Sequence, residues 1–101
     1  MKVLISPGYG AGWSTWHYDN NLATDKRLIE LFENGCTKEE MEEACIKYGY
    51  TDLYGGPPYM GGFNQLEIRN VPKGCLFQIR EYDGSEYVEI FNPDTYIKAE
   101  D

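Results

Sequence analysis

The pair Asp83-Gly84 constrains the fold more than any other feature of this sequence. Residues of alternating character run from Cys75 to Tyr82 before it and from Ser85 to Phe91 after it, which is typical of a β-hairpin with a type I′ turn. A two-residue loop fixes the register, so the last residue of the first strand faces the first residue of the second. The apolar side chains of one hairpin face, which we expect to pack against helices, are Phe77, Ile79, Val88 and Ile90.

Two consecutive helices are predicted between residues 24 and 49. The first is capped by Thr24 or Asp25 and ends at Gly35, a residue suited to the left-handed cap. The second begins at Thr37, because Thr37 and Glu40 have the spacing of a capping box. The apolar positions with helical spacing are Leu28, Leu31 and Phe32 in the first helix and Met41, Ala44, Cys45 and Tyr48 in the second.

The order of these elements predicts an α+β fold in a single globular domain, residues 1–101. The apolar segment Val3-Leu4-Ile5 is a strand, and a further short strand precedes the hairpin at 66–69. We expect a small, mainly antiparallel sheet of the N-terminal and C-terminal strands, packed against the two helices.

Composition excludes several classes of function. The formal net charge of -8 disfavours binding to a nucleic-acid polymer, whose phosphates would repel the chain. No apolar run approaches the roughly 20 residues that span a bilayer, so we expect a cytoplasmic protein and no membrane partner. The acidity either keeps a small protein soluble, or attracts a basic protein, or leaves room for a local anion site built from backbone N–H groups.

The residue types of metal and catalytic sites are sparse. Cys36, Cys45 and Cys75 lack C-x-x-C spacing, and we interpret Cys45 as a core residue. His17, the one histidine, has no Ser or Cys partner at motif spacing, and we assign it a structural or surface role. We therefore predict no metal, no cofactor and no catalytic residue.

The first glycine loop, Pro7 to Trp16, follows the N-terminal strand. Glycines at alternate positions can turn backbone N–H groups toward one point, as in phosphate-binding nests. The spacing lacks the third glycine of G-x-G-x-x-G, and no helix follows directly, so the Rossmann and P-loop motifs are excluded. Either the loop holds a phosphate or a flat ring, or it is a tight turn with Trp13 and Trp16 as core anchors. The candidate ligand-binding residues are Gly8, Tyr9, Gly10, Ala11, Gly12, Trp13, Ser14 and Trp16.

A second glycine loop, residues 54–64, repeats this chemistry. Its glycines and prolines exclude a regular helix or a central strand, and long loops in small domains are often functional. If the first loop is a site, we expect the two loops to share it. The candidate ligand-binding residues here are Tyr59, Met60, Gly61, Gly62, Phe63 and Asn64.

Four segments carry a resemblance to a known group of proteins. They are Lys2-Val3-Leu4-Ile5-Ser6-Pro7-Gly8-Tyr9-Gly10-Ala11-Gly12-Trp13-Ser14-Thr15-Trp16, then Leu28 to Gly35 with the Glu-rich helix, then Tyr59 to Asn64, and the hairpin Glu81 to Glu86. With them the chain resembles small uncharacterised proteins encoded by bacteriophages and prophages. The resemblance implies a phage setting, in the cytoplasm of an infected bacterium, and no particular activity.

Three hypotheses of function follow. The first is a non-enzymatic phage accessory protein that binds a small ligand through the two glycine loops. A nucleotide-derived immune signal is the ligand we favour, with the pocket formed in one chain or across a homo-oligomer. The second is an acidic inhibitor that binds a host protein, chiefly through Glu39, Glu40, Glu42 and Glu43. The third is a small enzyme that acts on a nucleotide or a sugar.

Overall fold

The computed structural model describes residues 1–95 and residue 99, and within them the fold is α+β, as predicted. The strands and α-helices are β1 (Lys2–Ile5), α1 (Lys26–Glu33), α2 (Lys38–Lys47), β2 (Glu67–Asn70), β3 (Leu76–Tyr82) and β4 (Ser85–Phe91). Single turns of 3-10 helix lie at η1 (Ser14–Trp16), η2 (Asn20–Ala23), η3 (Phe63–Gln65) and η4 (Pro93–Thr95).

The strands form two antiparallel ladders rather than one continuous sheet. β1 pairs with β2, and β3 pairs with β4. The Glu86 N–H donates to the Ser6 carbonyl at 2.9 Å, which links the start of β4 to the end of β1. Pro7 follows directly and has no N–H, so this pairing cannot continue along the chain.

The hairpin register is confirmed. Tyr82 pairs with Ser85 and Ile79 with Val88. Asp83 and Gly84 have φ values of 50° and 82°, the two left-handed conformations that a type I′ turn requires.

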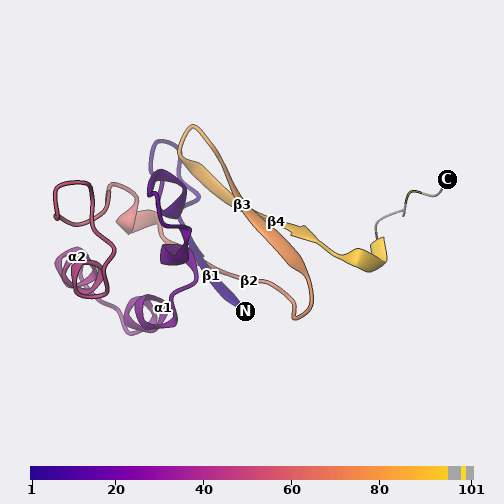
Figure 1. Ribbon diagram of the computed structural model, residues 1–101, viewed down its shortest axis with the longest axis horizontal. Helices are drawn as coiled ribbons and strands as arrows, with labels where there is room; N and C mark the ends of the chain where they lie inside the picture. Colours follow the sequence, from indigo (N-terminus) through magenta and orange to yellow (C-terminus); the bar gives the residue numbers. More distant parts are fainter. Residues whose placement is uncertain (96–98, 100–101) are drawn as a thin grey trace.

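The hairpin packs on β1 and not on the helices, so that part of our prediction is wrong. Val3 and Ile5 are buried against Phe77, Ile79 and Val88, whereas Leu4 lies in the other core cluster with residues of α1 and α2. β1 is therefore buried on both faces and lies between the helices and the hairpin (Figure 1). Because β1 already covers one side of the helices, the hairpin face covers the other side of β1, together with Ala23 of η2 and Val71. The last residue of that face, Ile90, remains 40% exposed.

Both predicted helix starts are confirmed. The Asp25 carboxylate caps α1 by accepting from the Arg27 N–H at 2.9 Å. Thr37 and Glu40 form the complete capping box of α2, with both hydrogen bonds at 3.1 Å. Cys45 is fully buried in the helical core, as expected.

Candidate functional site

The N–H groups of the first glycine loop converge on an anion, and that anion is the chain's own Glu86. One carboxylate oxygen accepts from the Ser6 N–H at 2.9 Å. The other accepts from the N–H groups of Trp13 at 3.0 Å and Thr15 at 2.9 Å, and from the Thr15 hydroxyl at 2.5 Å. Glu86 is only 1% exposed, so these four charge-assisted bonds offset the cost of its burial. An anion-binding arrangement is thus present at this loop, but its donors are Ser6, Trp13 and Thr15 and not the glycines, and Glu86 occupies it.

The β3–β4 turn also binds the first glycine loop, through two backbone hydrogen bonds. The Gly10 N–H donates to the Asp83 carbonyl at 2.5 Å, and the Gly12 N–H donates to the Gly84 carbonyl at 2.8 Å. A Cβ atom at Gly84 would lie 2.8 Å from the backbone nitrogen of Ala11, so the approach requires glycine. The loop is therefore fixed by a buried carboxylate and by backbone pairing with the turn.

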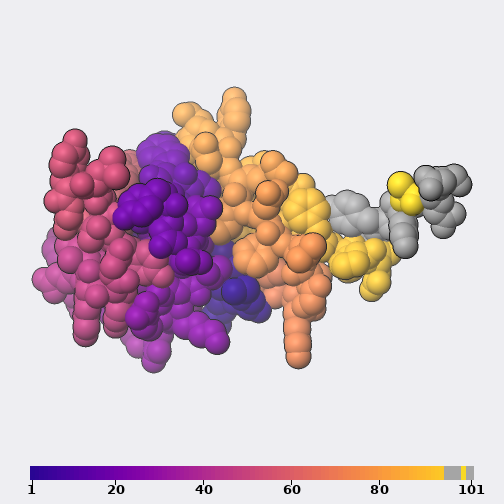
Figure 2. Space-filling model, in the orientation of Figure 1, coloured from indigo at the N-terminus to yellow at the C-terminus, as the bar shows by residue number. Residues whose placement is uncertain are grey.

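The two glycine loops meet in space. A Cβ atom at Gly62 would lie 2.7 Å from the Gly12 carbonyl oxygen, which shows how closely the backbones approach. The Tyr59 hydroxyl donates to the Gly10 carbonyl at 3.4 Å. The rings of Trp16 and Tyr59 lie 5.0 Å apart between centroids, tilted by 43°. In Figure 2 the segment around η1 lies between the residues that precede η3 and the β3–β4 hairpin.

The structure divides the predicted site residues into a buried and an exposed set. Trp13 is 1% exposed and packs with Leu4 and Met41, so for this residue the core-anchor interpretation applies. Phe63 is half-buried against the same core. The other buried members are Ala11, Gly12, Ser14, Met60 and Gly62; Gly8 is half-buried; the exposed members are Tyr9, Gly10, Trp16, Tyr59, Gly61 and Asn64.

An aromatic groove opens beside two of the exposed members, Trp16 and Tyr59. Its volume is about 540 Å³, within the range of small-molecule sites. Trp16 and Tyr59, which both line it, are 44% and 46% exposed. The groove is lined by Trp16, His17, Tyr18, Asp52, Leu53, Pro57, Pro58 and Tyr59.

His17 joins the two walls of the aromatic groove. Its Nδ1 lies 3.0 Å from the Asp19 N–H nitrogen and 3.3 Å from the Asp19 carbonyl, and its Nε2 lies 2.9 Å from the Thr51 carbonyl. Its ring stacks on Tyr18 with centroids 4.3 Å apart. The structural role that we assigned to this histidine is the one its contacts support.

Asp52 is the carboxylate of the groove. Its Oδ1 accepts from the N–H groups of Tyr54 at 2.8 Å and Gly56 at 2.9 Å, which shapes the loop. In the described part of the chain, Asp52 forms no ion pair. Our sequence reasoning assigned no ligand role to the groove residues His17, Tyr18, Asp52, Leu53, Pro57 and Pro58; the Pro-Pro pair beside exposed aromatic residues was the available signal.

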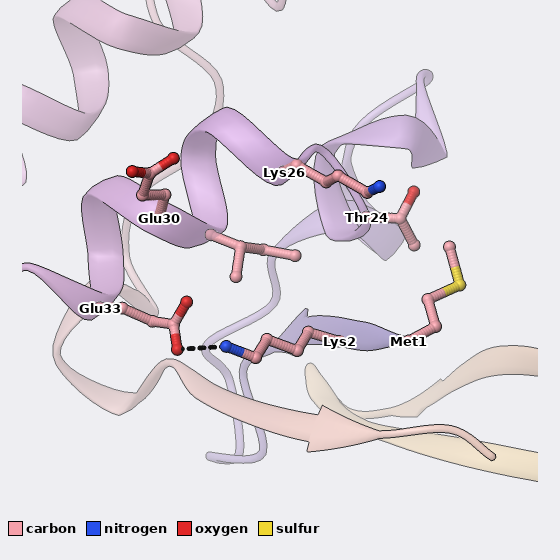
Figure 3. A pocket seen from close by; sticks show the side chains of 7 residues that line it. Met1, Lys2, Thr24, Lys26, Glu30 and Glu33 are labelled. Atoms are coloured by element: carbon pink, nitrogen blue, oxygen red, sulfur yellow. Dashed lines mark hydrogen bonds and ion pairs between the residues drawn. The ribbon is translucent and has the colours of Figure 1, made fainter. Parts of the chain in front are cut away.

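A second cavity, of about 510 Å³, lies between α1 and the start of β1, with Thr24 and Ile29 among its lining residues. Its lining carries both signs of charge, from Lys2, Lys26, Glu30 and Glu33, and Lys2 points toward Glu33 (Figure 3). Lys2 is already paired with Glu33 at 2.6 Å. None of our predicted site residues lines this cavity.

The titratable groups with shifted pKa values serve the fold. A hydrogen bond from the Arg27 side chain, partly opposed by burial, holds the pKa of the Asp25 carboxyl well below its usual range. Burial, together with a hydrogen bond to Asp25, raises the pKa of Tyr50 to about 12. Burial also raises the pKa of the Cys45 thiol to about 12 and that of Cys36 in the same direction, so neither thiol is activated.

Among residues 1–95 and 99, no three His, Cys, Asp or Glu side chains are grouped so that they could hold a metal ion. Likewise, no helix of this part of the chain has the length and apolar character to cross a bilayer. No protein-family profile matches the chain, and neither a curated protein nor a solved structure is significantly similar to it.

Proposed function

We propose that this chain is a non-enzymatic binding protein whose aromatic groove takes a small ligand with a flat ring. The observation that carries the proposal is the pair of half-exposed rings, Trp16 and Tyr59, 5.0 Å apart on a groove of about 540 Å³. A ring stacked on an aromatic side chain gains roughly 1–3 kcal/mol in single-stranded nucleic-acid complexes. A nucleobase is one ring of suitable shape.

The groove has a rigid side and a more exposed side. Trp16 ends η1, and the Glu86 carboxylate anchors this turn through Trp13 and Thr15. A ring held before the ligand arrives loses less conformational freedom on binding. On the other side, Leu53 is 87% exposed at the tip of its loop.

A nucleotide-derived signal, the ligand we favoured for a phage protein in an infected cell, belongs to this class. Its base would stack on Trp16. Its phosphates would not bind to the N–H groups of Trp13 and Thr15, because these groups already donate to Glu86. The proposal therefore depends on the ring and not on an anion site.

Isothermal titration calorimetry tests the proposal with four flat-ring probes: adenosine, cyclic di-AMP, nicotinamide and N1-methylnicotinamide. We expect saturable binding of at least one probe, lost in Trp16→Ala and in Tyr59→Ala. Tyr82→Ala is the matched control, because Tyr82 is 73% exposed on the hairpin, outside the groove. If no probe binds, or if Trp16→Ala binds as tightly as the unmodified protein, the proposal is wrong.

The acidic face of α2 supports a second candidate, the binding of a basic protein. Glu39 and Glu43 are exposed, while Glu40 is engaged in the capping box. The double substitution of Glu39 and Glu43 by Gln therefore removes charge and keeps the helix cap. This candidate requires that a purified basic partner bind in a salt-sensitive way and that the double variant weaken the complex.

A further inference from the structure

We infer that the ligand of the aromatic groove is a flat aromatic cation. This inference rests on the proposed function and adds the sign of the ligand's charge. It follows from three properties of the groove: its ionised side chain, its ring faces and the field of the whole chain.

The charged group on the groove wall is a carboxylate. The lining includes Asp52 and no Lys or Arg. His17 also lines the groove, and both of its ring nitrogens lie within hydrogen-bond distance of backbone groups of Asp19 and Thr51. Asp52 accepts two backbone hydrogen bonds but forms no ion pair within the described residues, so no cationic side chain there is paired with it.

The aromatic rings favour the same sign of charge. The face of an indole or phenol ring is the negative end of its quadrupole and attracts cations. Trp16 and Tyr59 are both about half exposed, and they line the same groove as Asp52. A flat cation could therefore stack on one ring while its charge lies toward Asp52.

The net charge of the whole chain favours the same sign of ligand charge as the groove does. The formal net charge is -8, so a cation approaches the molecule with electrostatic assistance and an anion against repulsion. A phosphate-bearing ligand would need a compensating cation at the groove, and the lining supplies none.

Three probes that share one ring test the inference by calorimetry: N1-methylnicotinamide, a fixed cation, nicotinamide, which is neutral, and nicotinate, an anion. We expect the cation to bind roughly threefold to tenfold more tightly than the neutral ring. We expect nicotinate to bind weakest. Equal or tighter binding of nicotinamide would overturn the inference and leave the proposed function intact, whereas no binding of any flat ring would overturn both.

A matched pair of variants separates the groove carboxylate from the overall charge. Asp52→Asn keeps an Oδ1 to accept from Tyr54 and Gly56, so the loop keeps its hydrogen bonds. Glu39→Gln changes the net charge equally on α2, away from the groove. We expect Asp52→Asn to reduce the preference for the cation at least twofold and Glu39→Gln to leave it unchanged. The same loss in both variants, or in neither, would contradict a local role of Asp52.

Discussion

Replacing Glu86 by Gln tests whether the buried carboxylate holds the first glycine loop. The substitution keeps the size of the side chain and exchanges one acceptor oxygen for an NH₂ donor. All four groups that contact Glu86 are donors: three backbone N–H groups and the Thr15 hydroxyl. Whichever way the amide is oriented, at least one donor faces another donor.

The contacts set the size of the effect. If the amide oxygen takes the position with three donors, the Ser6 N–H loses its acceptor, and a buried unpaired donor costs about 1–3 kcal/mol. The bonds that remain lose the assistance of the charge, which is worth about 1 kcal/mol or less for each. We therefore expect Glu86→Gln to lower the free energy of unfolding by about 2–5 kcal/mol, a large part of the stability of a small domain.

Urea denaturation followed by tryptophan fluorescence measures this change. The control is Glu89→Gln on the same strand, because Glu89 is partly exposed and pairs with Arg80 at the surface. Such pairs contribute about 1 kcal/mol or less. A Glu86→Gln protein within about 0.5 kcal/mol of the unmodified chain would refute the reasoning, since the loop would then hold its shape without the charge.

Three further predictions concern the fold. Gly84→Ala should destabilise the protein in urea by more than Gly74→Ala, because both glycines have positive φ values but only the Cβ at Gly84 would meet the first glycine loop. Asp25→Asn should reduce the acid sensitivity of thermal unfolding: the Asp25 pKa is lowered in the folded state, so its contribution is complete above about pH 4 and is lost as the pH falls below that value. A melting temperature that falls as steeply in acid for Asp25→Asn as for the unmodified chain would contradict this. Cys45 should react with a thiol reagent such as dithionitrobenzoate only after unfolding, since it is buried and its pKa is raised to about 12; rapid labelling of the native protein would show that the helical core opens.

Local signals in the sequence were sufficient for the elements themselves. The hairpin register depends on two residues, Asp83 and Gly84, and the start of α2 depends on the four-residue spacing of Thr37 and Glu40. The placement of the hairpin was wrong because alternation defines an apolar face without saying what covers it. Both β1 and the helices could have done so.

The carboxylate that the first glycine loop binds could be identified only from long-range contacts. Glu86 is 71 to 80 residues away from the groups that it binds. One signal was nevertheless present, because Glu86 lies on the same strand face as Val88 and Ile90 in the predicted register. A charged residue at an inward position must find partners or destabilise the fold, and backbone N–H groups freed by glycines are suitable partners.

The difference in burial between Trp13 and the rings of Trp16 and Tyr59 is the reason that we propose the aromatic groove as a binding site. The first glycine loop contributes to the fold in three ways. The Trp13 N–H donates to Glu86, the Trp13 ring packs in the core, and the loop backbone lies close to Gly62. Trp16 and Tyr59 contribute a ring contact and one long hydrogen bond to the fold, yet the two residues remain 44% and 46% exposed, and exposed aromatic groups favour association. We therefore expect a ligand to engage these rings, since a partly apolar surface held next to a fixed loop loses little conformational freedom on binding.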